Sequence, residues 1–312
     1  MKSVDVVIPV YGNWETVRQC LMSLNSQSTE VSIIVVDDCS PDDTAENIVS
    51  SFPNIRLIQN SKNLGFAKTC NRGIASGDSD LVVLVNSDVV ADRYMVENLQ
   101  KTFEENPEVG SATPLLLKPN GLVDGFGITV DSTLSGFVRY SGRTVEQLRE
   151  YFPPVLAAYG AVAAFRRKAL DQVGLLDENI FMYGEELDLG LRLIASGWKS
   201  EAVISATGVH IGGASIGLGS PGQREKSGFG RGYILKSYGV LKTRFAARAL
   251  VTEVLVCIAD TIIHRDLAAI RGRILGWKVG RYAPEKPKIK DIKLADISFL
   301  KSMRLRSSKV MF

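Results

Sequence analysis

The chain has 312 residues, of which 45 % are hydrophobic and 23 % are charged, so it has the composition of a globular protein with a substantial core. Its four cysteines include no Cys-x-x-Cys pair and it has two histidines, which argues against a disulfide scaffold and a histidine-rich zinc centre. No apolar run reaches the roughly 18–20 residues that span a membrane. We therefore expect reduced thiols, a cytoplasmic location and an N-terminal strand rather than a signal peptide.

The first ninety residues alternate between two kinds of pattern. Continuous apolar runs predict buried strands, and amphipathic runs predict helices. The strands are expected at 3–12, 31–38, 55–60 and 80–88, and the helices at 13–27, 40–52 and 65–76. Asn13 is expected to cap the first helix, and Ser40 with Pro41 to begin the second. This alternation predicts an α/β fold with a mostly parallel sheet, whose strands end at one common edge.

Polar residues follow the predicted strands at that edge. They are Pro9 and Tyr11, Asp37 and Asp38, Asn60 and Asn63, and Asn86 and Asp88. Open α/β sheets bind ligands in the crevice beyond this edge. The chain has neither a G-x-G-x-x-G nor a G-x-x-x-x-G-K-[ST] loop for phosphates. A divalent metal held by acids, Mg²⁺ or Mn²⁺, is the expected counter-charge for a bound nucleotide.

Three acids crowd the start of a later helical pattern, in ENIFMYGEELDLGLRL (178–193). Acids in a first helical turn complement the helix dipole, and Asp188 can pair with Arg192 one turn away. Those effects explain Asp188 but explain Glu185 and Glu186 only in part, because the preceding residues are apolar. The two glutamates are therefore candidates for a chemical role.

Several motifs together carry a family resemblance. They are VVIPVYGN, VVDDCSPDDT, NLGFAKTCNRGI, LVVLVNSDV, the segment from AAFRRKAL to LIASGW, and GVHIGGASIG. In order and spacing, residues 3–217 resemble family 2 glycosyltransferases with a GT-A fold. The pattern is most similar to bacterial rhamnosyltransferases of cell-surface polysaccharide assembly. The resemblance implies a Rossmann-like, mostly parallel sheet flanked by helices, and an inverting sugar transfer.

The resemblance implies a nucleotide-sugar site at the strand ends. Tyr11 would stack on the base with Pro9 beside it, and Asp38 would accept a hydrogen bond from the base. Asn63, Lys68 and Asn71, in the motif NLGFAKTCNRGI, would lie near the base or ribose. Lys68 is the better candidate for a contact with a phosphate or with the base.

The metal site is implied by two further motifs. NSD at 86–88 stands where the family has its D-x-D motif, so Asp88 would bind the metal and Asn86 would lie near the ribose. The first acid of the motif is an asparagine here, as it often is in the rhamnosyltransferase-like members of the family. His210 would complete the metal site or contact the diphosphate, whereas His264 is expected to be structural or exposed.

GEELDLGLR matches the segment that usually supplies the catalytic base. A carboxylate must take the proton of the acceptor hydroxyl while the metal stabilises the leaving diphosphate. Glu186 is the expected base, in a position where the family more often has aspartate, and Glu185 is the alternative.

The resemblance also implies the substrates. The expected donor is dTDP-rhamnose, with a UDP-hexose or UDP-galactofuranose as the alternative, and the expected acceptor is a glycan or a polyprenyl-diphosphate-linked glycan. A nucleotidyltransferase is disfavoured because PVYGNWETV lacks a basic phosphate loop. A non-catalytic protein that binds sugar nucleotides is a third alternative, which Asp88 and the two glutamates disfavour.

We expect a catalytic domain at 1–219, with a nucleotide-sugar half (1–117) and an acceptor half (118–219), followed by a helical region at 220–312. The stretch 118–152 is expected to form acceptor-side loops and a lid, with Asp124 and Asp131 exposed. Residues 244–312 carry a net charge of +9 and the remainder −6, so the tail is expected to meet something anionic.

The sequence leaves two alternatives for the basic tail. Residues 295–312 could lie on an anionic membrane, placing the protein peripherally at the inner face of the plasma membrane. Alternatively, the helices pack on the catalytic domain or form a homodimer. Nucleic acid is not expected as a partner, because the basic residues lack an interleaved aromatic platform.

Overall fold

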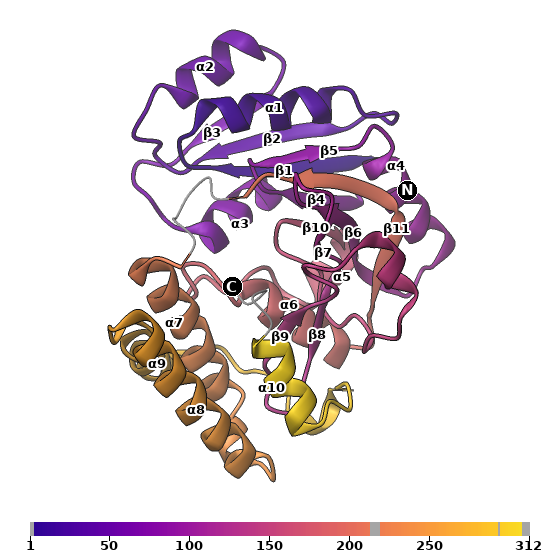
Figure 1. The fold of residues 1–312 in the computed structure, drawn as a ribbon. Coiled ribbons are helices and arrows are strands. Elements are labelled where there is room, and N and C mark those ends of the chain that lie inside the picture. Colours follow the sequence, from indigo (N-terminus) through magenta and orange to yellow (C-terminus); the bar gives the residue numbers. More distant parts are fainter. Residues whose placement is uncertain (1–2, 213–218, 293, 308–312) are drawn as a thin grey trace.

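The computed structural model describes residues 3–212, 219–292 and 294–307. A nine-stranded sheet runs in the order β3-β2-β1-β4-β10-β6-β11-β5, with β7 paired to β6 (Figure 1). The strands are β1 Val4–Val10, β2 Ser32–Asp37, β3 Arg56–Gln59, β4 Leu81–Val85, β5 Val89–Ala91, β6 Val109–Leu117, β7 Val123–Gly125, β10 Val162–Arg166 and β11 Lys199–His210. The pairs β1–β2, β1–β4, β2–β3 and β6–β11 are parallel, whereas β10, β5 and β7 run antiparallel to their neighbours.

Helices cover both faces of this sheet. They are α1 Trp14–Asn25, α2 Thr44–Ser51, α3 Phe66–Ser76, α4 Met95–Glu105, α5 Arg167–Val173 and α6 Glu185–Ala195. Val6 and Ile8 of β1 pack in one core cluster with α1, α2 and α4. Val7 packs in a second cluster with α3, α5 and α6. Successive side chains of a strand point to opposite faces, so a continuous apolar run is what a strand covered on both faces requires.

The four predicted strands and the α/β class are confirmed, but one predicted helix cap and one predicted helix start are wrong. Asn13 lies before α1 with φ 65° and makes no side-chain cap. The second helix begins at Thr44 rather than near residue 40. The Ser40 hydroxyl is occupied elsewhere, since it bonds Asp37 and accepts a 2.7 Å hydrogen bond from the Gly12 amide. Ser40 therefore ties two strand ends together instead of capping a helix.

The stretch 118–152 is more ordered and more buried than its glycine content predicts. It contains β7 and a two-stranded sheet of β8 Ile128–Val130 and β9 Gly136–Val138, followed by the 3₁₀ turn η1 Val145–Arg149. Asp131 was expected in an exposed loop, but its side chain is buried. It accepts hydrogen bonds from Thr133 and from Ser302 of the C-terminal region, which covers it.

The C-terminal region is helical, as predicted, and its helices α7, α8 and α9 form a layer on one side of the molecule (Figure 1). Its elements are α7 Pro221–Ser237, η2 Val240–Lys242, α8 Ala246–His264, α9 Ala268–Val279, η3 Gly280–Tyr282, η4 Ile289–Asp291 and α10 Phe299–Ser307. Ile234, Ala249 and Ile289 share a hydrophobic cluster with Ile128 and Leu191 of the preceding part. The domain boundary near 219 stays a prediction.

The described part of the basic tail packs on the body, which favours the second alternative for residues 299–307. Ser302 is 1 % exposed and donates a 2.8 Å hydrogen bond to Asp131. The Arg306 guanidinium lies 5.2 Å from the centre of the Phe137 ring.

Residues 308–312, and residues 213–217 of the motif around His210, lie outside the described residues. Among the described helices, none combines the length and apolarity that crossing a bilayer requires.

Candidate active site

Strand pairing brings His210 to Asp88. The antiparallel pairing of β11 with β5 sets His210 opposite Val89, and the Ile211 amide donates a 2.9 Å hydrogen bond to the Asp88 carbonyl. His210 Nε2 lies 3.2 Å from Asp88 Oδ1, with the two side chains 15 % and 9 % exposed. Two residues that the sequence separates by more than a hundred positions therefore meet at the sheet edge, as the family resemblance implies.

Two residues that the sequence analysis missed complete this cluster. Asp124 was expected to be exposed, but it is largely buried on β7 and its Oδ2 lies 2.7 Å from His210 Nδ1. The Tyr159 hydroxyl donates a 2.9 Å hydrogen bond to the same Asp124 oxygen. Asp124 thereby fixes the imidazole so that Nε2 faces Asp88, which is how carboxylates usually orient metal-binding histidines.

The charge of His210 follows from this setting. Burial alone would lower its pKa, but hydrogen bonds to Asp124 and Asp88 outweigh that effect and raise the pKa to about 9. The imidazolium therefore offsets one of the two negative charges of Asp88 and Asp124 when no other cation is present. A metal cation bound at Nε2 would displace that proton, since a metal needs the neutral imidazole.

The residues at this cluster fit a hard divalent cation. Cis ligands at about 2.1 Å from an octahedral ion lie about 3 Å apart, close to the separation of Asp88 Oδ1 and His210 Nε2. No group of three or more acidic, histidine or cysteine residues that could hold a metal occurs within the described ranges. Two protein ligands suit Mg²⁺ or Mn²⁺, which usually take their remaining ligands from water and substrate phosphates.

The two glutamates stand at the start of α6. Tyr183 and Gly184 turn the chain with φ 69° and 111°, and the Gly184 amide donates a 3.2 Å hydrogen bond to Glu186 Oε2. Glu185 is 4 % exposed and one of its buried oxygens has no hydrogen-bond partner, whereas Glu186 is half-buried. Burial and the adjacent charge of Glu186 raise the pKa of Glu185 well above its usual range, and burial raises the pKa of Glu186. Glu186 is thus the more accessible carboxylate.

Tyr159 and Gly160 connect the glutamates to the cluster around Asp88. A Cβ on Gly160 would lie 3.6 Å from the Glu186 carboxyl carbon, so this glycine borders the carboxylate. Burial and the negative charges of Asp124, Glu186 and Asp88 together raise the pKa of Tyr159 well above its usual range. Tyr159 and Gly160, which are adjacent in the chain, therefore contact Asp124 of the cluster and border Glu186 of the pair.

Asp188 is a buried residue that anchors α6 and does not face the cluster around Asp88. It is 0 % exposed and bonds Arg192 at 2.9 Å, as the sequence spacing predicted. Lys286 also lies 2.7 Å from Asp188 and 2.7 Å from Asp177, with its own side chain 2 % exposed. This buried ion network ties the C-terminal region to the helix that carries the glutamates, and no sequence pattern marks Lys286 for it.

The predicted donor-side residues lie at the ends of the parallel strands. Tyr11 follows β1 and Pro9 and is 39 % exposed. Asp38 is buried and accepts hydrogen bonds from Asn60, from the Leu64 amide at 2.8 Å and from the Gly65 amide at 2.9 Å. It holds the loop that carries Asn63.

The four other predicted donor-side residues differ in whether protein hydrogen bonds already occupy their side chains. Asn63 and Lys68 are exposed, and Asn86 is half-buried after β4. Asn71 is occupied, since its amide bonds the backbone of Leu176 in both directions, at 2.9 and 3.1 Å. It is thus a structural residue in this fold rather than a free ligand contact.

The model of Glycosyl transferase family 2 matches residues 5–174. This chain belongs to glycosyltransferase family 2. It is 32 % identical over 239 residues to the N-acetylglucosaminyl-diphospho-decaprenol L-rhamnosyltransferase of Mycobacterium tuberculosis, covering 69 % of this chain and 78 % of that protein. The family membership and the relative support a glycosyltransferase.

Solved structures of GT-A glycosyltransferases share the fold of this family 2 chain. A mannosyltransferase from Pyrobaculum calidifontis, in complex with GDP-Man and Mn²⁺, has a TM-score of 0.55 at 15 % identity and covers 91 % of this chain and 76 % of that one. GalNAc-T7 with UDP, GalNAc and Mn²⁺ has a TM-score of 0.57 at 14 % identity, covering 85 % and 59 %. The predicted GT-A type sheet is therefore confirmed.

Proposed function

We propose that this glycosyltransferase is a metal-dependent, inverting enzyme that transfers L-rhamnose from dTDP-rhamnose to a hydroxyl of a glycan or of a polyprenyl-diphosphate-linked glycan. One observation carries the proposal: Tyr159 donates a hydrogen bond to Asp124 of the Asp88–His210–Asp124 cluster, and Gly160, the next residue, borders the Glu186 carboxylate. The donor and acceptor are proposed from the mycobacterial relative, whose name states a rhamnosyl transfer to a lipid-linked sugar. The enzyme would work in the cytoplasm, peripherally at the inner face of the plasma membrane.

The leaving-group side is assigned to the cluster. Asp88 and His210 would hold Mg²⁺ or Mn²⁺, which supplies positive charge to the departing diphosphate. Asp124 and Tyr159 keep the His210 ring oriented, so Nε2 faces Asp88 before any ligand arrives. Such preorganised groups lose little energy in rearranging during the reaction.

The acceptor side is assigned to Glu186. Its carboxylate is half-buried and ionises more easily than that of Glu185, whose pKa is raised further by burial and by Glu186 itself. Glu186 would accept the proton of the attacking hydroxyl as the new glycosidic bond forms on the face of the sugar opposite the diphosphate. Glu185 stays the alternative base, and its unpartnered buried oxygen could instead bond a sugar hydroxyl.

The nucleotide is assigned to the strand ends. Tyr11 would stack on the base beside Pro9, and Asn63, Lys68 and Asn86 would lie along the base, phosphate and ribose. Asp38 already accepts three protein hydrogen bonds, so its contact with the base would use a remaining lone pair. These groups do not separate thymine from uracil, so a UDP-hexose or UDP-galactofuranose is the alternative donor.

A thermal-shift screen of nucleotide sugars tests the donor. With Mn²⁺ and dTDP-rhamnose at about a hundred times the dissociation constant, binding adds about 2.7 kcal/mol of stability, and we expect the melting temperature to rise by about 5 °C or more. EDTA should abolish most of that rise. A larger rise with a UDP-sugar would replace the donor assignment, and no rise with any nucleotide sugar would contradict the proposed function.

A further inference from the structure

Helix α8 exposes an unusually apolar side. Its large apolar side chains that are 44–72 % exposed are Leu250, Val251, Val254, Leu255, Ile258, Ile262 and Ile263. Leu267, just before α9, and Ile274 and Leu275 of α9 are also exposed, at 48–53 %. We call these ten residues the apolar face. Soluble proteins rarely leave a contiguous apolar area of this extent open to water without a binding role.

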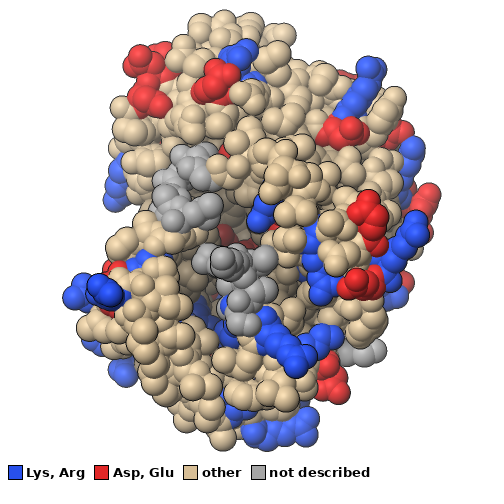
Figure 2. Space-filling view, in the orientation of Figure 1, with Lys and Arg blue, Asp and Glu red and all other residues tan. Residues whose placement is uncertain are grey.

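The apolar face is continuous along the helix. Leu250, Val254, Ile258 and Ile262 recur every four residues, so they form one row about 18 Å long on the helix surface. Val251 and Leu255 form a second row beside it. Figure 2 shows the surface over α8 as largely uncharged, with basic side chains at its margins. A flat partner could therefore cover the whole row at once.

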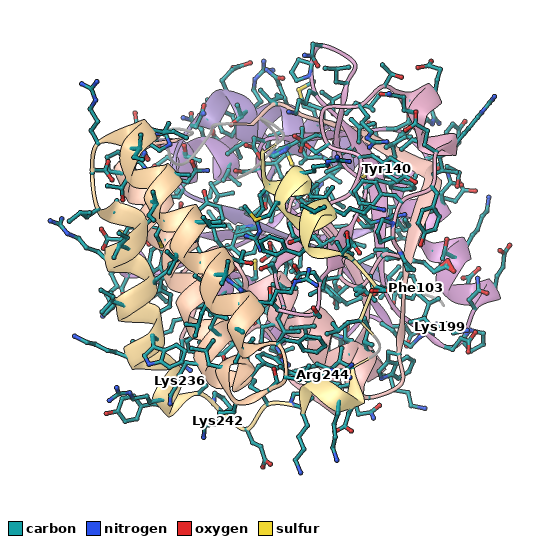
Figure 3. The ribbon with its side chains drawn as sticks, turned by 60° about the horizontal axis from the view of Figure 1, so that its bottom comes forward. Phe103, Tyr140, Lys199, Lys236, Lys242 and Arg244 are labelled. Carbon is teal, nitrogen blue, oxygen red and sulfur yellow. The ribbon has the colours of Figure 1, made fainter. Side chains whose placement is uncertain are left out.

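The charges around the apolar face are one-sided. Every fully exposed Lys, Arg, Asp or Glu between residues 240 and 282, all of which the structure describes, is basic: Lys242, Arg244, Arg265, Arg271, Lys278 and Arg281. Lys242 and Arg244 precede α8 in the chain, and Figure 3 shows both in the lower part of the molecule. Within this stretch the exposed charges beside the apolar face are all cationic, which suits a partner that is apolar inside and anionic at its surface.

The acidic side chains within residues 240–282 are at least partly buried and form ion pairs with arginines. Glu253 lies 2.7 Å from Arg231 and 2.9 Å from Arg273, with 13 % of its side chain exposed. Asp266 pairs with Arg224, whose Nε lies 3.6 Å from Asp260. Within residues 240–282, no exposed carboxylate therefore offsets the positive charge of the rim, whereas Glu225 of α7, whose backbone contacts Gly272, is exposed.

We propose that the apolar face docks the enzyme on an anionic lipid bilayer, with α8 lying in the plane of the interface. Helices that lie in an interface bury an apolar face among the acyl chains and are attracted to anionic headgroups by basic residues. A second copy of this chain is the less suitable occupant, because a two-fold contact would bring two identical cationic rims together. This surface replaces residues 295–312 as the proposed membrane contact.

The docking surface is joined tightly to the glutamates. A Cβ on Gly272 of α9 would lie 1.9 Å from the Glu225 carbonyl oxygen of α7, so these helices touch along their backbones. A Cβ on Gly230 of α7 would lie 1.9 Å from the Tyr183 carbonyl oxygen, just before the glutamate pair. The inference rests on the proposed function to this extent: a lipid-linked acceptor would reach Glu186 from the bilayer that α8 binds.

Vesicle flotation tests the proposal with the full chain and no substrate. Vesicles of phosphatidylcholine alone are compared with vesicles containing phosphatidylglycerol at about a third of the lipid. We expect at least about tenfold more protein to float with the anionic vesicles, and a loss of about tenfold in the Ile258→Ser/Ile262→Ser variant. The matched control is Val49→Ser/Ile204→Ser, which changes two exposed apolar residues on other elements.

Two further experiments test whether the basic rim contributes to vesicle binding and whether the apolar face forms a dimer instead. Arg271→Glu should weaken flotation, and Lys168→Glu on α5, also exposed, should not. Equal flotation of all variants, or none by the wild type, would overturn the proposal. A second result would also overturn it: the wild type sediments as a dimer, and the Ile258→Ser/Ile262→Ser variant sediments as a monomer but floats with vesicles as the wild type does. Donor-induced thermal shifts of the same variants are expected to be unchanged, so a failure of docking is distinguishable from a failure of the proposed function.

Discussion

The Glu186→Gln variant is expected to turn over at least about 10²-fold more slowly than the wild type while binding the donor with near-native affinity. Glutamine has the size of glutamate but cannot accept the proton of the attacking hydroxyl at neutral pH. The residue does not touch the diphosphate in our assignment, so the loss falls on kcat. Initial rates and calorimetric donor binding measure the two effects separately.

Glu185→Gln is the matched control for that variant, because it removes an adjacent carboxylate that is buried and harder to ionise. We expect it to lose less activity than Glu186→Gln. Burial raises the pKa of Glu186, so the wild-type rate should rise with pH through a value above that of an ordinary glutamate. Turnover of Glu186→Gln within a few-fold of wild type, or a deeper loss in Glu185→Gln, would remove Glu186 from the role.

The Asp88→Asn variant is expected to lose the metal-dependent part of donor binding. A cation that neutralises a diphosphate contributes several kcal/mol, so donor affinity in Mn²⁺ should fall by about 10²-fold or more. Asparagine keeps the shape of the side chain but offers a neutral oxygen or an amide to the cation. Calorimetry with and without Mn²⁺ measures the difference.

Asp78→Asn is the matched control for Asp88→Asn, because Asp78 is exposed in the turn before β4, away from the strand ends. It should bind the donor like the wild type in Mn²⁺. Donor affinity of Asp88→Asn that equals the wild type in both conditions would contradict the metal assignment.

Much of the fold follows from local sequence patterns. The strands β1, β2 and β4 are short apolar runs followed by polar residues, and such runs are recognisable in the sequence because helices cover both faces of the sheet. The motifs around Asp88, Glu186 and His210 were part of the family resemblance. The family model over residues 5–174 confirms the family, and the solved structures confirm the fold. The roles of these residues stay predictions.

The parts that could not be predicted depend on contacts between distant segments. Asp124 reaches His210 only because β7 pairs back onto β6, and a glycine-rich stretch gives no sign of that pairing. Lys286 enters the core from a segment whose charges look solvent-exposed in sequence. The sequence of residues 246–279 predicts helices with apolar and basic side chains. It does not show which side of each helix stays exposed, because that depends on how α7, α8 and α9 pack together.

A crystal structure with Mn²⁺ and an intact nucleotide sugar tests the central claim, that Asp88 and Glu186 serve opposite faces of one sugar ring. The account predicts anomalous density for Mn²⁺ within about 2.5 Å of Asp88 and His210 Nε2. It also predicts the anomeric carbon between the diphosphate and the Glu186 carboxylate. Manganese bound elsewhere, or a sugar ring whose open face is turned away from both Glu185 and Glu186, would contradict it.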